Sequence, residues 1–278
     1  MTNQQEIISL ELSPSDLDVL RDAYALLENP SLAIRLSSAV GMPLEAVAKQ
    51  LSQKAPKAIV EAVEKSTQKA IELVMLNTVR TFSAETSTRA KPGLHKAAVA
   101  TTGAVAGFFG LETLIVELPI TTGIMFRSIV DIARAEGESP KDHETILNAM
   151  QVFAIGSGIS DQDDAAETSY YGARLVLSKA VSDALQYVLS HGLGNVSAPV
   201  LVRFIAAVAS RFGIVVTQKA VAQSLPILGA VGGGLVNTMF ISHFQDMARG
   251  HFAIRRLERH YGEVPVRNAY QRISNPGK

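Results

Sequence analysis

The chain has 278 residues, of which 47% are hydrophobic and only 19% charged, and its 26 basic and 26 acidic residues cancel. Soluble domains usually carry about 25% charged residues, so this chain is unusually apolar, and its neutrality excludes a general electrostatic attraction to nucleic acid. The absence of cysteine excludes disulfides, thiolate nucleophiles and cysteine-ligated zinc. The first residues carry neither a basic segment nor a long apolar run, which predicts a cytoplasmic protein without a secretion signal.

Helix start and stop signals recur through the first third of the chain. Ser13 precedes Pro14 and an acidic turn, which predicts an N-cap and a helix that ends before Pro30. A second helix is expected over residues 30–40. A long amphipathic helix is expected over about 56–82, because apolar residues recur there at helical spacing opposite lysines and glutamates.

A polar segment over residues 83–93 separates two regions of different character. It contains serine, threonine, charged residues and a Pro-Gly pair, a composition typical of linkers. The sequence therefore predicts an N-terminal helical region over residues 1–83 and a second helical domain over residues 91–278.

Two uncharged segments carry glycines at a spacing of four residues. The segment 97–111 contains Gly103 and Gly107, and the segment 220–242 contains Gly229 and Gly233. Glycines at this spacing lie on one helix face and let another helix approach closely. Such a face suits both tight packing in a soluble core and packing among lipid tails.

Proline, glycine and acidic residues mark the ends of five more predicted helices. Their expected ranges are 118–134, 139–156, 161–192, 198–219 and 235–261, followed by a short tail. No segment alternates apolar and polar residues with a period of two, so no sheet is expected. The predicted fold is all-α, a multi-helix bundle with two glycine-patterned apolar helical regions.

Neither uncharged segment is expected to span a membrane. A span needs about 20 predominantly apolar residues. The first segment soon meets Glu112 and Glu117, and the second contains Pro226 and Asn237. We interpret both as buried helices, or as a helical hairpin that dips partway into a bilayer.

The last long helix carries the densest polar chemistry. His243, Met247 and His251 share one stripe, but the two histidines are about 12 Å apart along the axis, too far to bind one metal ion. A metal site would need His243 with Asp246 and a ligand such as Glu117 from another helix. The sequence contains no recognised metal motif, and we expect no metal and no cofactor.

The end of this helix is basic. Arg249, Arg255 and Arg256 suit contact with anionic lipid headgroups, and they equally suit the favourable placement of cations near the end of a helix. We expect the charges of this helix to pair with other helices, because an unpaired buried charge is costly, and Arg127 and Asp131 are the first candidates.

Two stretches together resemble the EcsC family. The first contains Leu118-Pro119, Thr121-Thr122, Arg127-Ser128 and Gly137-Glu138. The second contains Gly229, Gly233, Asn237, Phe240, His243, Asp246, Arg249-Gly250-His251-Phe252 and Arg255-Arg256. The resemblance covers roughly residues 91–270 and implies a bacterial, membrane-associated protein, since the family is named after a protein encoded beside an ABC transporter. It implies no catalytic residues.

The leading hypothesis is a non-enzymatic, membrane-peripheral protein at the cytoplasmic face of the membrane. It would bind membrane lipid or a membrane protein, perform no defined reaction and bind no nucleic acid, and a link to transport would fit. The residues expected to bind or pack are Gly103, Gly107, Gly229, Gly233, Thr121, Thr122, Arg127, Asn237, Arg249, Arg255 and Arg256.

Two alternatives remain open from the sequence. One is a hydrolase or metal-dependent enzyme, whose catalytic site would combine His243, Asp246 and His251 with Glu117. The other is a scaffold or homo-oligomer whose apolar surface is an interface.

Overall fold

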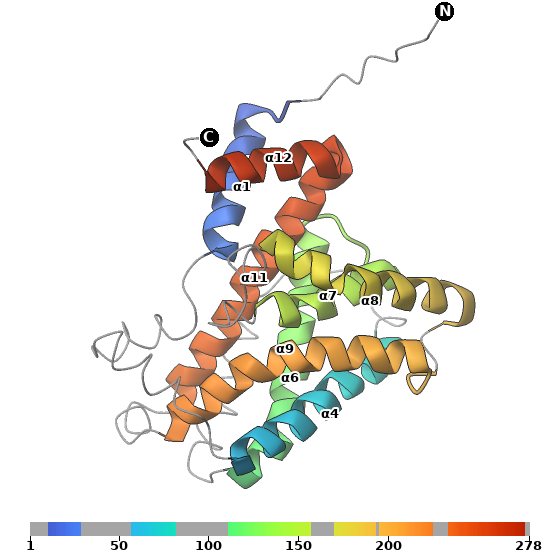
Figure 1. The fold of residues 1–278 in the computed structure, drawn as a ribbon, viewed down its shortest axis with the longest axis vertical. Coiled ribbons are helices and arrows are strands. Elements are labelled where there is room, and N and C mark those ends of the chain that lie inside the picture. Colours follow the sequence, from blue (N-terminus) through green and yellow to red (C-terminus); the bar gives the residue numbers. More distant parts are fainter. Residues whose placement is uncertain are drawn as a thin grey trace, which may run out of the picture.

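The computed structural model describes residues 11–28, 57–81, 111–156, 170–192, 195–224 and 233–275. Every regular element within these residues is an α-helix, which confirms the predicted all-α bundle. Figure 1 shows the arrangement of the helices. They are α1 (Pro14–Leu27), α4 (Lys57–Thr81), α6 (Leu111–Ala135), α7 (His143–Ile155), α8 (Tyr170–His191), α9 (Pro199–Ser224), α11 (Gly233–Tyr261) and α12 (Glu263–Ser274).

Local sequence signals account for several helix ends. The Ser13 hydroxyl accepts a hydrogen bond from the amide of Asp16 and so caps α1, with Pro14 as the first helical residue, as predicted. Gly262 ends α11 with a φ of 86°, a conformation that L side chains rarely adopt. The helix predicted over 56–82 is α4.

The core forms around α7, which contacts α6, α8, α9 and α11. Its residues from Thr145 to Ile155 are all buried. Phe153 of α7 lies against Phe212 of α9 and Phe244 of α11, with ring centroids 4.9 and 5.4 Å apart. A helix that is buried on all sides carries apolar residues all round, and α7 is mainly apolar, with Thr145, Asn148 and Gln151 as its buried polar residues.

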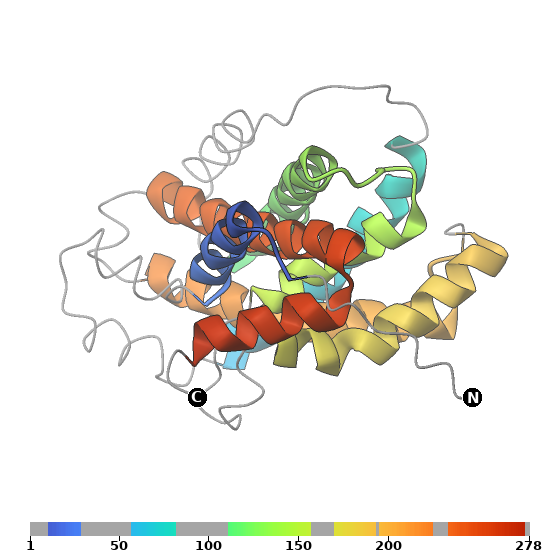
Figure 2. The same ribbon diagram turned by 90° about the horizontal axis from the view of Figure 1, so that it is seen from above.

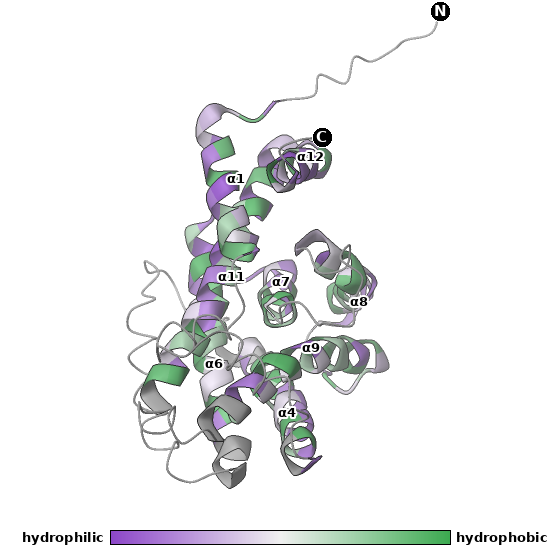
Figure 3. Cartoon of the chain, turned by 60° about the vertical axis from the view of Figure 1, so that its left-hand side comes forward, coloured by the Kyte–Doolittle hydropathy of each residue, from purple (hydrophilic) through white to green (hydrophobic). Residues whose placement is uncertain are grey.

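The remaining helices pack around this core in two groups. The helix α4 packs along α6 and α9, whereas α1 and α12 pack on α11 and on each other. Figures 1 and 2 show α1 and α12 together at the end of the molecule where α11 finishes. Hydrophilic and hydrophobic residues intermingle on both helices in Figure 3, as expected for helices with one face on the core.

Two helix boundaries differ from the sequence prediction. The predicted start at Leu118-Pro119 is wrong, because α6 begins at Leu111 and Pro119 lies inside it. A proline removes one backbone hydrogen bond, and neighbouring helices can hold the helix on both sides of it.

The predicted tail after residue 262 is also wrong, since residues 263–274 form α12. Pro265 lies in the first turn of α12, where an amide has no partner within the helix, so it does not oppose helix formation. Val266 and Tyr270 are buried and hold the helix in place.

Some predictions fall outside the described residues. These are the helix over 30–40, the boundary between 83 and 91, and the glycines Gly103, Gly107 and Gly229. Gly233 is the first residue of α11. By length and composition one described helix, over Pro199–Ala220 of α9, could cross a membrane, and core helices of soluble proteins meet the same criterion.

Candidate functional site

A buried ion pair joins three helices. The Lys219 ammonium of α9 donates to the Glu117 carboxylate of α6 over 3.1 Å, and the Asn237 amide of α11 donates to the same oxygen over 2.9 Å. The side chain of Lys219 is 0% exposed and that of Glu117 is 7% exposed. The ammonium also lies 4.9 Å from the ring centroid of Phe240, within the range of a cation–π contact.

Burial and pairing oppose each other at Lys219. Burial lowers the pKa of the ammonium, whereas the charge of Glu117 and its hydrogen bond raise that pKa. The carboxylate therefore does most to keep a charged lysine inside the core. Sequence reasoning singled out Glu117 and Asn237 but missed Lys219, whose only signal was a lone lysine at the end of an apolar run.

The ion pair marks one end of the bundle, which we call the apolar end. It lies where α6 and α11 begin and α9 finishes, and these three helix ends lie toward the bottom of Figure 1. The uncharged segment 97–111 leads into α6, and the segment 220–242 includes the connection from α9 to α11. Both segments therefore join the bundle at the apolar end.

A row of buried hydroxyl groups and amides continues from the apolar end along α6 and α11. Thr121 and Thr122 are 0% exposed, and their hydroxyls have no hydrogen-bond partner among the described residues. Farther along, the amide of Gln245 donates to the Ser128 hydroxyl over 2.7 Å. The contacts of residues 117 and 128 with residues 237 and 245 follow the same order in both helices, so α6 and α11 run parallel.

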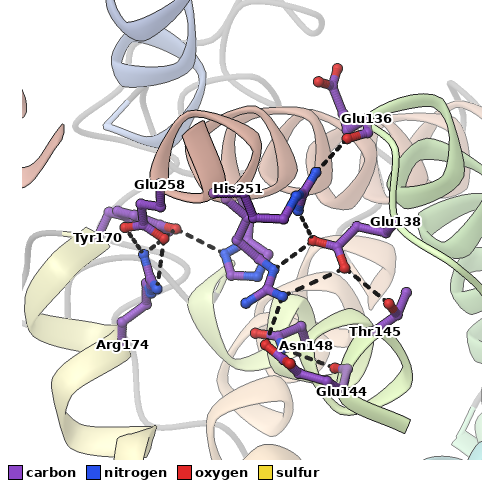
Figure 4. Close-up of polar contacts among 11 residues, drawn as sticks. Glu136, Glu138, Glu144, Thr145, Asn148, Tyr170, Arg174, His251 and Glu258 are labelled. Atoms are coloured by element: carbon purple, nitrogen blue, oxygen red, sulfur yellow. Dashed lines mark hydrogen bonds and ion pairs between the residues drawn. The ribbon is translucent and has the colours of Figure 1, made fainter. Parts of the chain in front are cut away.

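A second polar network surrounds His251. The Tyr170 hydroxyl lies 2.9 Å from His251 Nδ1, and Arg174 donates to the same hydroxyl over 3.2 Å (Figure 4). Arg174 also forms two hydrogen bonds with the Glu258 carboxylate, of 2.7 and 3.1 Å. The Tyr170 hydroxyl can donate to Nδ1 when the histidine proton is on Nε2, or accept from Nδ1 when the proton is there.

His251 is held neutral by its surroundings. Burial lowers the pKa of the imidazole well below its ordinary value of 6.5, and the charges of Arg174 and Arg255 lower it further. Burial also raises the pKa of the Tyr170 hydroxyl. Both groups are fully enclosed, so this network fits a structural junction between α8 and α11 better than a site open to substrate.

A third network neutralises the arginines at the end of α11. Arg255 donates to Glu138 over 2.9 Å and to Glu144 over 2.9 Å, and Arg259 donates to Glu138 as well (Figure 4). Arg256 pairs with Glu136 over 3.2 Å. We call this region the charged end of the bundle.

Glu138 is the centre of the charged end. Burial alone would raise the pKa of its carboxyl group, but hydrogen bonds from Arg255 and Thr145 and the charges of Arg255 and Arg259 hold the pKa below its ordinary value of 4.5. The carboxylate thus stays ionised and ties the connection between α6 and α7 to α11.

The predicted charge pairing is confirmed in part. Arg255 and Glu258 pair with other helices or connections, as expected, but their partners are Glu138, Glu144 and Arg174. Arg249 pairs with Asp246 of its own helix over 2.7 Å.

The residues of the enzyme alternative have separate partners. His243 Nε2 bonds to the backbone carbonyl of Gly156, His251 bonds to Tyr170, and Glu117 bonds to Lys219 and Asn237. Within the described residues no three His, Asp or Glu side chains are grouped to hold a metal ion.

A groove of about 480 Å³ lies between α4 and α6. Sequence reasoning did not foresee it, although it had singled out Arg127. The lining residues are Leu73, Val74, Asn77, Thr78, Pro119, Ile120, Gly123, Ile124, Phe126 and Arg127.

Comparison with known families gives a match over residues 27–257, to the EcsC protein family. The chain belongs to the EcsC protein family. The match includes the buried ion pair, the α4/α6 groove and the His251 network except Glu258, whereas α12 and nearly all of α1 lie beyond it. The EcsC match begins well before residue 91, where the sequence resemblance had begun. No curated protein and no solved structure matches the chain.

Proposed function

We propose that this EcsC family protein is a peripheral membrane protein, which binds lipid or a membrane partner at the cytoplasmic face of a bacterial membrane through its apolar end. It performs no chemical reaction in this proposal.

The position of the Glu117–Lys219 pair carries the proposal. An isolated carboxylate near a bilayer would oppose insertion by several kcal/mol. Here the carboxylate is buried and paired with Lys219 and Asn237, so it presents no net charge to a surface. The two uncharged segments that join the bundle at this end can then approach lipid without that penalty.

The charged end supports the same orientation. Arg255, Arg256 and Arg259 are compensated by three glutamates, so they are poorly suited to recruit anionic headgroups. The leucine nearest the start of α11, Leu235, is 37% exposed at the apolar end.

Fractionation of bacterial cells tests the proposal. We expect part of the protein to sediment with membranes and to be released by alkaline carbonate or high salt, because the proposed attachment is peripheral. A protein that stays entirely in the supernatant at low salt would contradict membrane binding. Release by detergent alone would contradict a peripheral attachment.

A further inference from the structure

The α4/α6 groove has a volume and a lining that suit a hydrocarbon chain. We infer that it holds one acyl chain of an anionic membrane phospholipid, with Arg127 binding the headgroup phosphate. This inference rests on the proposed membrane function and names the ligand and the site.

The floor of the groove is open because it lacks a side chain. Gly123 lies within α6, and a Cβ atom added there would meet no heavy atom within 4 Å. A glycine inside a helix costs about 0.5–1 kcal/mol relative to alanine. The missing side chain leaves room for a ligand to lie against the helix backbone.

The walls of the groove are mainly apolar, with Asn77 and Thr78 as their uncharged polar side chains. Leu73 and Val74 come from α4, and Ile120, Ile124 and Phe126 come from α6. Thr78 donates its hydroxyl to the carbonyl of Val74 over 2.6 Å, so this polar group is already satisfied within its own helix. Ile120 is 53% exposed, an apolar surface that a bound chain would cover.

Arg127 supplies a positive charge one helical turn beyond Gly123. Arg127 is exposed and is one of the residues that line the groove. A guanidinium stays charged at physiological pH and offers two parallel N–H groups to a phosphate. An apolar groove with a cation along it is complementary to an acyl chain joined to an anionic headgroup.

The volume of the groove favours a hydrocarbon chain over a protein segment as the ligand. Its 480 Å³ lies within the usual range for small-molecule sites. A helix is about 10 Å across with side chains, so this volume would hold only about one turn of it. A single hydrocarbon chain of a phospholipid is slender enough for a groove of this volume.

Binding of a labelled lipid to the full chain tests the inference. The probe is phosphatidylglycerol with a fluorophore on one acyl chain, and free fatty acid with the same fluorophore serves for comparison. Gly123→Leu fills the groove from its open floor, and Arg127→Gln removes the charge. Ser178→Leu adds the same leucine to an exposed face of α8, where Ser178 bonds only within its helix, and serves as the control.

We expect wild type and Ser178→Leu to bind labelled phosphatidylglycerol equally. Gly123→Leu should weaken the affinity about tenfold or more while its thermal melt shows a folded protein. Arg127→Gln should weaken binding of phosphatidylglycerol about tenfold and binding of labelled diacylglycerol, which lacks the phosphate, much less.

Two results would overturn the inference in distinguishable ways. If wild type floats with phospholipid vesicles but Gly123→Leu binds the lipid probe as well as wild type, the groove is wrong and the membrane function stands. If wild type binds only the fatty acid probe and does not float with vesicles, the phospholipid site and the membrane function both fail.

Discussion

The two ends of α11 handle charge in opposite ways. At the apolar end one carboxylate meets one ammonium, with side chains 7% and 0% exposed, inside an apolar core. At the charged end three arginines share three glutamates whose side chains range from 7% to 53% exposed. The charges balance within each set of paired residues, in the interior for the first and nearer to water for the second.

Paired charges at the two ends of α11 therefore differ in how much each depends on its partner. A buried pair depends on its partner, because the interior cannot solvate the charge that remains when one is removed. A network near water is screened, so each of its contacts stabilises less.

The largest effect is expected at the apolar end. Lys219→Met should lower the free energy of unfolding by about 3–5 kcal/mol, because Glu117 would be left as an unpaired buried charge. The double variant Glu117→Gln with Lys219→Met should recover much of that loss. Urea unfolding of the three proteins measures both, and a loss below about 1 kcal/mol for Lys219→Met would contradict a dry, paired site.

Removal of one cation at the charged end should lower the free energy of unfolding by less. Arg255→Met should lower the free energy of unfolding by about 2 kcal/mol, because Glu138 keeps its contacts with Arg259 and Thr145. Urea unfolding at low and high salt measures the change. A cost as large as that of Lys219→Met would show that the two ends do not differ as described.

Replacement of glycine by alanine should change the stability in opposite directions at two positions on neighbouring helices. Gly250 of α11 lies under α1, and a Cβ there would come within 2.5 Å of Leu27 Cγ and 3.0 Å of the Ala23 carbonyl. Gly250→Ala should therefore cost about 1–2 kcal/mol, whereas Gly123→Ala should stabilise by about 0.5–1 kcal/mol in the open groove. Thermal melts measure both, and equal shifts would contradict the covered and open positions.

Lowering the pH should reduce the free energy of unfolding through His251 and Glu138. His251 has a lowered pKa when folded, so below its ordinary value of 6.5 the unfolded chain binds a proton that the folded chain does not. Stability should therefore fall with pH below about 6.5, by up to ~1.4 kcal/mol per pH unit from this group. Glu138, with a lowered pKa, stabilises above its ordinary value of 4.5 and loses this effect as pH falls further.

The variant His251→Gln isolates the histidine contribution. A glutamine oxygen can still accept from Tyr170 but does not titrate. Its free energy of unfolding, measured by urea between pH 7 and 5, should depend less steeply on pH than that of wild type. Parallel curves would show that His251 is not held neutral.

Local signals made part of this structure predictable. The Ser13 cap and the stop at Gly262 depend on neighbouring residues and were correctly expected. Pro119 and the helix after Gly262 were misjudged, because packing of distant helices outweighs a local breaker. Glu117 was singled out from the sequence as a charge next to an uncharged segment, but Lys219, 102 residues away, could be found as its partner only in three dimensions.

The α4/α6 groove could not be predicted from the sequence for the same reason. It forms where α4 and α6 pack, and the absence of a side chain at Gly123 gains meaning only from the space around it. The resemblance to the EcsC family gave the correct family and an expected place in the cell, but no site.

The most direct test of the membrane role compares labels at opposite ends of the molecule. The chain has no cysteine, so Leu235→Cys and Val264→Cys each give a single site for an environment-sensitive fluorophore. These residues are 37% and 56% exposed, in the first turn of α11 and in α12. With phospholipid vesicles we predict that the label at 235 brightens and shifts to the blue while the label at 264 does not change. No change at 235, or a change confined to 264, would contradict the account.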